Sequence, residues 1–300
     1  MRKAKNYSEM EAALVLDAKA TLGEGAIWHP AEKRLYWVDI EGRMLHLYDP
    51  ATEEDKVWPV EERVGTVVPV VNGGALVALQ NGIHFIDTET GELKSVVNPI
   101  KVDDIRFNDG KCDPAGRFWV GTMALDSREG AAVLYRMEQD GSIKQVLDNL
   151  SVSNGIVWTA DHKTMYLIDT PTRKVQAFAY DQETGAIRKE REVLSIPDWE
   201  GKPDGMTIDE HGNLWIALYG GSGVGCWDPE TGEMLHKVNV PAPHTTSCAF
   251  GGERLDTLYI TTARDGLDND LLQKYPQSGG IFAVKPDVRG VPANFFMNRL

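Results

Sequence analysis

The sequence predicts an all-β fold: a six-bladed β-propeller whose four-stranded antiparallel blades surround a central channel. Three observations predict it. The 29 glycines separate short runs in which apolar and polar residues alternate, as they do in strands. Six of these runs resemble one another and recur at a nearly constant spacing. No segment after residue 14 shows a sustained helical periodicity of apolar residues.

The six similar runs share a bulky apolar residue near their start, followed by further apolar or aromatic residues. Their anchor residues are Leu35, Leu76, Phe118, Met165, Leu214 and Leu258. Successive anchors lie 41, 42, 47, 49 and 44 residues apart. A period of roughly 40–50 residues is typical of propellers with four strands in each blade.

Turn sequences flank the anchors and divide each unit into strands. Most anchors follow a short polar turn such as DPAGR or IDEHGN. Beyond several anchors the chain turns again, at Asp49-Pro50 and at the D-x-E-T-G segments 87–91, 181–185 and 228–232. Asp, Pro and Gly at these places predict hairpin connections between the outer strands of a blade.

The main alternative is a pair of β-sandwiches, which would also contain many short strands. Six similar anchors favour the propeller. Because a closed propeller needs all its blades, residues 14–300 are expected to form a single domain. Residues 1–13 are expected to be an N-terminal tail or part of the closing blade.

Composition excludes several classes of function. Acidic residues outnumber basic ones by 45 to 31, giving a net charge of −14, so nucleic acid and anionic membranes are not expected partners. No apolar run reaches the length of a membrane helix. The three cysteines form no C-x-x-C pair, which predicts reduced thiols and a cytoplasmic location. The expected state is a monomer or weak homo-oligomer.

Equivalent polar residues precede the anchors by 10 or 11 positions, in the strand expected to line the channel. They are Glu24, Thr66, Asn108, Asn154, Asp204 and Ser247. Glycine directly follows Glu24, Asn154 and Asp204, which would permit close approach of the backbone to a ligand. Six blades would bring these side chains together in one ring.

Such a ring of carboxylate, amide and hydroxyl oxygens suits a hard divalent cation such as Ca²⁺, Mg²⁺ or Mn²⁺. The seven histidines form no H-E-x-x-H or H-x-H pattern that would favour zinc. The simpler alternative is that the N-G and D-G pairs only make β-turns. Their common phase within the repeat favours the metal site.

At these residues the sequence resembles a known family. The segment RFNDGKCDPAGRFWVGTM at 106–123 closely resembles the signature of the regucalcin/gluconolactonase family of sugar-lactone hydrolases. SNGIVW at 153–158, PDGMTID at 203–209 and TTSCAFGG at 245–252 are similar to later motifs of that family. The resemblance covers about residues 14–285 in order. It implies a six-bladed propeller with one catalytic divalent metal.

The resemblance also implies roles for individual residues. Glu24, Asn154 and Asp204 would ligate the metal, while Arg106 and Asn108 would hold sugar hydroxyls or the lactone oxygen. Asp126 occupies a substrate-binding position where the family often has glutamate, one methylene longer. This difference leaves the size and orientation of the substrate open.

The expected function is therefore the metal-dependent hydrolysis of a small neutral sugar lactone. The metal would polarise the carbonyl group and activate a water molecule, with Asp204 as general base. Arg106 would stabilise developing negative charge. The structural alternative for Arg106 is an ordinary ion pair with Asp103 or Asp104.

Two other functions stay open. One is a non-catalytic Ca²⁺-binding propeller, and the other is an organophosphate-type esterase with similar oxygen ligands. A serine hydrolase is not expected, because no G-x-S-x-G motif is present. Ca²⁺ is the first expectation for the metal, with Zn²⁺, Mn²⁺, Mg²⁺ and Fe²⁺ as alternatives.

Overall fold

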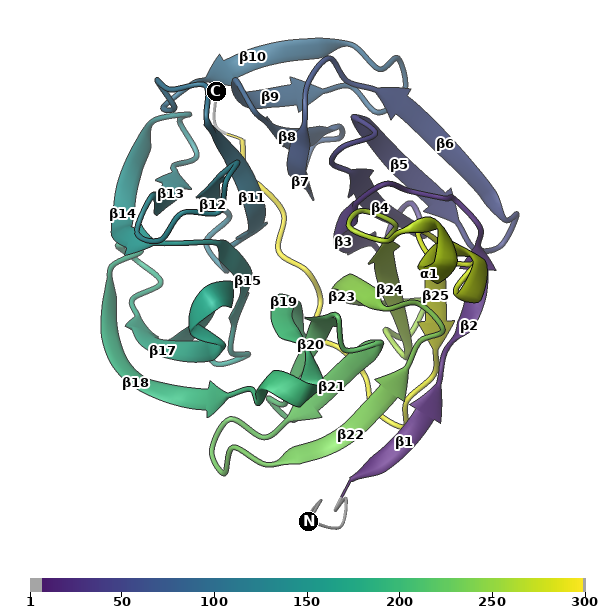
Figure 1. Ribbon diagram of the computed structural model, residues 1–300. Helices are drawn as coiled ribbons and strands as arrows, with labels where there is room; N and C mark the ends of the chain where they lie inside the picture. The colour runs from purple at the N-terminus through teal and green to yellow at the C-terminus, as the bar shows by residue number, and fades with distance from the viewer. Residues whose placement is uncertain (1–6, 299–300) are drawn as a thin grey trace.

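The computed structural model describes residues 7–298 and is an all-β structure (Figure 1). Four separate sheets contain four antiparallel strands each, and a fifth sheet contains nine strands. The sheets stand side by side around a central axis in Figure 1, instead of packing face to face as in a β-sandwich. The prediction of an all-β fold built from four-stranded antiparallel sheets is confirmed, and the arrangement is consistent with a propeller.

The nine-stranded sheet divides into two groups, because only one residue pair, Tyr219 with His244, joins β20 to β23. We number six groups of strands in chain order, as the first to fourth sheets and the fifth and sixth groups. The first strands of the groups surround the axis: β3 (Gly23–His29), β7 (Val64–Pro69), β11 (Ile105–Cys112), β15 (Ser153–Trp158), β19 (Lys202–Ile208) and β23 (His244–Gly251). Each of these inner strands contacts the next, and β23 contacts β3, which closes the ring.

The remaining strands follow outward from the axis. The second strands carry the anchor residues: β4 (Arg34–Asp39), β8 (Ala75–Leu79), β12 (Phe118–Ala124), β16 (Thr164–Asp169), β20 (Leu214–Tyr219) and β24 (Thr257–Ala263). The third strands are β5 (Met44–Asp49), β9 (Gly82–Ile86), β13 (Ala132–Met137), β17 (Lys174–Tyr180), β21 (Gly223–Trp227) and β25 (Ile281–Val284). The outermost strands are β6 (Glu54–Pro59), β10 (Leu93–Val97), β14 (Ile143–Leu150), β18 (Ile187–Ser195), β22 (Met234–Asn239) and β2 (Ala13–Leu16).

Short helical segments and the two chain ends complete the structure. The helical segments are η1 (Thr170–Thr172), η2 (Asp198–Glu200) and α1 (Asn269–Lys274). The N-terminal strand β2 pairs with β25 and completes the sixth group with the other end of the chain. Strand β1 (Ser8–Glu11) pairs in parallel with β22, so these residues form a strand and not a tail. Residues 1–6 of the expected tail lie outside the described residues.

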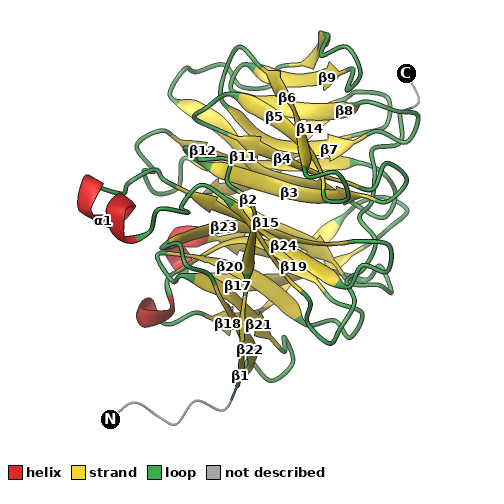
Figure 2. Cartoon of the chain, turned by 90° about the vertical axis from the view of Figure 1, so that its right-hand side faces the viewer, coloured by secondary structure: helices red, strands yellow, loops and turns green. Residues whose placement is uncertain are grey.

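The C-terminal segment 285–298 crosses the axis on one face of the ring (Figure 1). Gly290 pairs with Asp209 beyond the end of β19, Asn294 Nδ2 donates to the Cys112 carbonyl at the end of β11, and Phe296 pairs with Val70 beyond β7. The segment therefore covers the face where inner strands end. Figure 2 shows α1 on the opposite face, where inner strands begin.

Apolar side chains fill the spaces between neighbouring groups of strands. All six anchor residues are buried in the second strands, as the spacing predicted. One core cluster joins Val68, Phe107, Phe118 and Phe296, and so includes both the second and third sheets and the C-terminal segment. This burial is the main source of the fold's stability.

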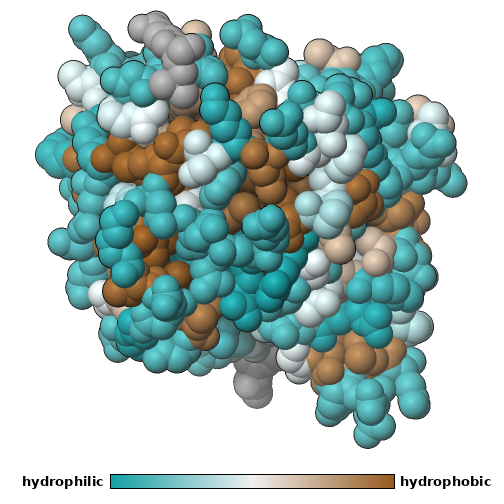
Figure 3. Space-filling view, turned by 90° about the horizontal axis from the view of Figure 1, so that it is seen from above, coloured by the Kyte–Doolittle hydropathy of each residue, from teal (hydrophilic) through white to brown (hydrophobic). Residues whose placement is uncertain are grey.

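The outer surface is polar, and the thiols are inside. The side view in Figure 3 shows hydrophilic side chains over most of the surface, with hydrophobic ones in separate areas between them. All three cysteines, Cys112, Cys226 and Cys248, are buried and unpaired, as expected. No helix in the described part of the chain has the length and hydrophobicity to span a membrane.

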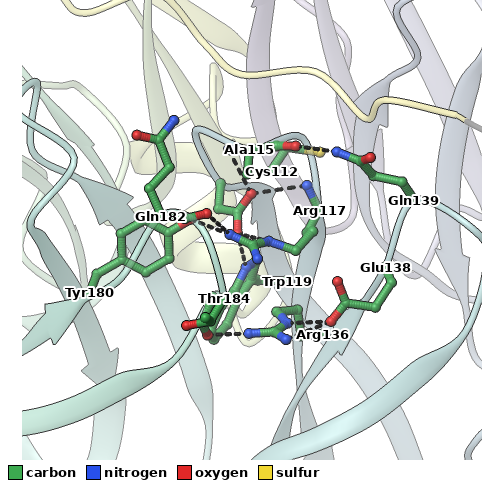
Figure 4. A network of polar contacts seen from close by, with 12 residues as sticks. Cys112, Ala115, Arg117, Trp119, Arg136, Glu138, Gln139, Tyr180, Gln182 and Thr184 are labelled. Carbon is green, nitrogen blue, oxygen red and sulfur yellow. Dashed lines mark hydrogen bonds and ion pairs between the residues drawn. The ribbon is translucent and has the colours of Figure 1, made fainter.

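A buried polar network ties the third sheet to the fourth (Figure 4). Asp113, which is fully buried, accepts hydrogen bonds from Arg117 Nε at 2.7 Å and Trp119 Nε1 at 2.8 Å. Arg117 in turn donates to Tyr180 Oη at 2.8 Å and to the Gln182 carbonyl at 2.6 Å. The turn D-P-A-G-R thus provides both a β-hairpin and a contact between sheets.

We expect Asp113→Ala to lower the free energy of unfolding by about 3–5 kcal/mol, because the Arg117 guanidinium would be left buried without its carboxylate. Urea denaturation followed by tryptophan fluorescence measures this loss. A matched control is Glu190→Ala, which breaks the exposed Arg188–Glu190 pair (3.0 Å). Its expected cost is below about 1 kcal/mol. Equal effects of the two substitutions would contradict the importance of the buried network.

Candidate metal centre

A β-bulge interrupts every inner strand at nearly the same level. The register of pairing with the second strand shifts between Glu24 and Ile27, Val64 and Thr66, Phe107 and Gly110, Ser153 and Ile156, Pro203 and Met206, and Thr245 and Cys248. A bulge breaks the alternation of side chains and redirects those beside it. The bulges coincide with the polar positions that sequence spacing selected.

The N-G and D-G pairs therefore lie inside strands and do not form turns. Asn154 and Asp204 occupy the bulges of β15 and β19, and Glu24 begins the bulge of β3. All three side chains are buried. The turn interpretation of these pairs is wrong, because paired residues continue on both sides of each bulge.

The bulge glycines have a different role from the one the sequence suggested. A Cβ atom on Gly155 would lie 2.8 Å from the Asp204 carbonyl oxygen, and one on Gly205 would lie 2.8 Å from Ser247 Cα. Both spaces are occupied by a neighbouring inner strand. Glycine is thus required here for the close packing of the strands around the axis, whatever ligand the channel holds.

The hydrogen-bonding groups around Asn154 leave an oxygen atom available. Its Nδ2 donates to Thr170 Oγ1 at 3.1 Å, and Thr170 donates to the Pro203 carbonyl at 2.8 Å. The buried Asn154 Oδ1 and Asp204 Oδ1 have no hydrogen-bond partner. Buried polar atoms are normally satisfied, so two such oxygens on adjacent strands are suited to bind a cation or a hydrogen-bond donor.

Burial raises the pKa of Asp204 to about 8, and repulsion by Asp109 adds to this rise. Hydrogen bonds from Asn154 and Glu24, and the charge of Arg106, offset part of it. Burial also raises the pKa of Glu24 well above its ordinary value, with added repulsion from Asp204 and Asp109. Without a cation, Asp204 is therefore held largely protonated below about pH 8, and the raised pKa of Glu24 favours its protonated form as well.

Arg106 and Asn108 lie together in β11, as predicted. Arg106 Nη1 donates to Asn108 Oδ1 at 2.8 Å and to the Phe107 carbonyl at 2.9 Å, while Asn108 Nδ2 donates to the Ser153 carbonyl at 2.9 Å. The Arg106 guanidinium is buried and interacts electrostatically with Glu24 and Asp204. In the described part of the chain, Arg106 forms no ion pair with Asp103 or Asp104, the alternative that the sequence left open; its Nη1 binds Phe107 and Asn108, and Arg128 binds Asp104 at 2.7 Å.

Sequence reasoning missed two residues of the channel. Asp109, next to Asn108 in the same bulge, is buried, and its Oδ2 has no partner. Burial raises its pKa, and the charge of Lys111 opposes that rise. Lys111 donates to the Met206 carbonyl, which connects β11 to β19. A regular strand would direct Asn108 and Asp109 to opposite faces, so only a predicted bulge could have identified both.

Thr66, Ser247 and Asp126, the remaining residues that the sequence selected, have no unpartnered buried oxygen among the described residues. Thr66 Oγ1 donates to the Gly110 carbonyl at 3.2 Å, and Ser247 Oγ accepts from the Ala26 amide at 3.3 Å. These hydroxyls join neighbouring strands. Asp126 follows β12 at the same end of the molecule as Arg106, but its side chain is 64% exposed and binds Arg128 at 3.2 Å. It lies outside the buried cluster.

The buried donor set fits a hard divalent cation. Glu24, Asn154 and Asp204 offer carboxylate and amide oxygens, of which two are unpartnered and buried. Among residues 7–298, no three Asp, Glu, His or Cys side chains form a metal-binding group, so an amide oxygen is needed to complete the set. The absence of clustered His and Cys disfavours a zinc cage of the usual structural type.

Comparison with known proteins agrees with this architecture. Residues 22–264 match the family described as SMP-30/Gluconolactonase/LRE-like region. Regucalcin of Danio rerio is 38% identical over 288 residues, covering 95% of this chain and 98% of the relative. YvrE of Bacillus subtilis (strain 168), a predicted sugar lactone lactonase, is 36% identical over 282 residues, covering 94% and 97%.

Solved structures show the same fold. The calcium-binding protein regucalcin from Agrobacterium tumefaciens superposes with a TM-score of 0.91 at 26% identity, covering 99% of this chain and all of that chain. The chain belongs to the SMP-30/gluconolactonase/LRE-like family. This family includes proteins named for lactonase activity and proteins named for calcium binding.

We expect the metal-free protein to lose stability as the pH rises from about 4 to about 8. The folded state holds protons on Glu24 and Asp204 that the unfolded state has released in this range, so unfolding becomes more favourable as pH increases. Melting temperatures measured across this range in excess chelator test the expectation. Asp204→Asn should reduce the fall, because it removes one of the two carboxyl groups.

The control for this experiment is Asp140→Asn, which changes an exposed carboxylate whose pKa is lowered by hydrogen bonds from Ser142. This substitution should leave the fall in place. A wild-type melting temperature that stays constant or rises across the range would contradict the assignment of buried, protonated carboxyl groups.

Proposed function

We propose that this protein is a metal-dependent hydrolase that opens sugar lactones to the corresponding aldonic acids. The observation that carries the proposal is the convergence of Glu24, Asn154 and Asp204, with two unpartnered buried oxygens, beside the buried guanidinium of Arg106. Names within the family that refer to lactonase activity support it. We also propose that the six groups of strands are the six blades of a single propeller domain.

Each proposed residue has a distinct role. Glu24, Asn154 and Asp204 would hold one divalent cation, with Ca²⁺ as the first choice; when bound, it would polarise the lactone carbonyl and lower the pKa of an attacking water. Asp204 would accept a proton from that water. Arg106 would stabilise charge on the carbonyl oxygen, because Phe107 and Asn108 orient one guanidinium nitrogen and leave other donors available.

The proton balance follows from these roles. Water adds to the carbonyl carbon, and its proton passes to Asp204. The bond from the carbonyl carbon to the ring oxygen then breaks, and the ring oxygen receives the proton. One N–H of Asn108 Nδ2 donates to the Ser153 carbonyl, and the second would donate to a sugar hydroxyl, so we assign Asn108 to orienting Arg106 as well as substrate.

We propose that Asp126 contacts the substrate only at the outer edge of the site, because its carboxylate is exposed and binds Arg128. Reduced cysteines remain the basis for proposing a cytoplasmic location.

We expect Asp204→Ala to lower kcat/KM for glucono-1,5-lactone by at least about 10²-fold, since it removes the proton acceptor and a metal ligand. Acid release in a pH-stat measures this change. Gln145→Ala on the exposed side of β14 is the control and should retain wild-type activity. Undiminished hydrolysis by Asp204→Ala would overturn the proposed mechanism.

Calcium at 100 times its dissociation constant should raise the melting temperature by roughly 4 °C. Asn154→Ala should abolish most of this shift, since it removes the unpartnered amide oxygen, whereas Gln145→Ala should not. Differential scanning fluorimetry measures binding independently of activity.

The two alternative functions predict other results. A non-catalytic Ca²⁺-binding protein would show the same shift in melting temperature without hydrolysing any lactone. An organophosphate-type esterase would hydrolyse a phosphotriester faster than a lactone.

A further inference from the structure

A polar cavity of about 520 Å³ lies on the face of the ring where the inner strands begin. Its wall comes from connections of the first and second sheets: residue 43 between β4 and β5, 62–63 between β6 and β7, 80–81 between β8 and β9, and 98–103 between β10 and β11. We call it the rim cavity. The proposed metal ligands are not part of its wall.

The rim cavity lies beside the proposed reaction centre. Arg63 in its wall directly precedes β7, and the neighbouring inner strand β11 carries Arg106. Arg63 Nη1 donates to Gln80 Oε1 at 3.2 Å, and Gln80 Nε2 donates at 2.9 Å to the carbonyl of Asp103, which lies three residues before Arg106. Substrate bound at Arg106 can therefore extend into this cavity toward the second sheet.

The wall suits a neutral group rich in hydroxyls. Arg63 is neutralised by Glu41, whose two oxygens lie 2.8 and 2.9 Å from its Nε, so it does not act as a free cation. Arg43 and Lys101 line the same cavity as the carboxylates of Glu62 and Asp103. With cations and carboxylates balanced, the cavity has no surplus charge to select an anion.

An independent observation points to a ligand hydroxyl. Glu62 lines the cavity and is only partly buried, while its Oε2 is covered by neighbouring atoms and has no hydrogen-bond partner; a turn of the carboxylate would bring this oxygen to the cavity. A carboxylate oxygen in this state is an acceptor without a donor. The apolar side chain of Val102, which is 54% exposed, offers a contact surface for the C–H groups of a sugar ring.

We propose that the rim cavity is a subsite for a neutral sugar ring attached to the lactone, which makes a glycosylated aldonolactone the preferred substrate. This inference rests on the proposed lactonase function. The volume lies within the usual range for small-molecule sites, about 300–1,000 Å³. The lactone ring occupies the position at Arg106, and the attached ring binds Glu62.

The test compares kcat/KM for cellobiono-1,5-lactone and glucono-1,5-lactone. The wild type should prefer the disaccharide lactone by about tenfold, as expected for hydrogen bonds to a charged acceptor. Glu62→Ala should bring the ratio of the two values close to one, mainly through KM for the disaccharide lactone. Gln145→Ala should leave the ratio unchanged. Equal wild-type values for both lactones, or an unchanged ratio in Glu62→Ala, would overturn the subsite.

Binding of cellobiitol, a neutral compound without a lactone, separates this proposal from the proposed function. Calorimetry should detect binding to the wild type and a loss of at least about tenfold in affinity for Glu62→Gln, which keeps the shape of the side chain. If neither lactone is hydrolysed but this pattern holds, the lactonase proposal fails and the sugar subsite stands. No binding of cellobiitol to the wild type would overturn the subsite.

Discussion

The close packing of six inner strands around one axis is the constraint on which the rest of the structure depends. Each strand must pass near the axis and still continue its sheet outward. A bulge at one level in every strand meets both demands, since it bends the strand and redirects its side chains. The glycines at 155 and 205 let neighbouring backbones approach, as the blocked Cβ positions show. The same local distortion brings Glu24, Asn154 and Asp204 into a buried cluster.

Without a bound cation, this buried cluster destabilises the folded protein. Burial disfavours the ionised forms of Glu24 and Asp204. The nearby carboxylate of Asp109 disfavours them further through charge repulsion. Arg106 and Lys111 supply fixed positive charge within the channel, but two oxygens remain unpartnered. A divalent cation would resolve both problems at once. The C-terminal segment covers the other end of the ring, so the proposed substrate would enter where the inner strands begin.

Much of this architecture was predictable because it repeats. The anchors Leu35 to Leu258 mark second strands, and the D-x-E-T-G segments connect third and outermost strands, as in β9–β10. The nearly constant spacing from the anchors also identified Asn154 and Asp204. Features that occur only once in the chain could not be predicted from a repeat. Strand β1 and the C-terminal segment lack a periodic pattern, and the rim cavity combines four connections that are distant in sequence. Asp109 was missed because strand alternation allows only one of two successive residues to face the channel.

The central claim is that the bulges of β3, β15 and β19 together form one cation site. Anomalous diffraction from crystals of the full chain soaked with Mn²⁺ tests it most directly. The account predicts one strong peak in the channel, within coordination distance of carboxylate or amide oxygens of Glu24, Asn154 and Asp204. A peak held by other residues, or no peak in the channel at saturating Mn²⁺, would contradict it.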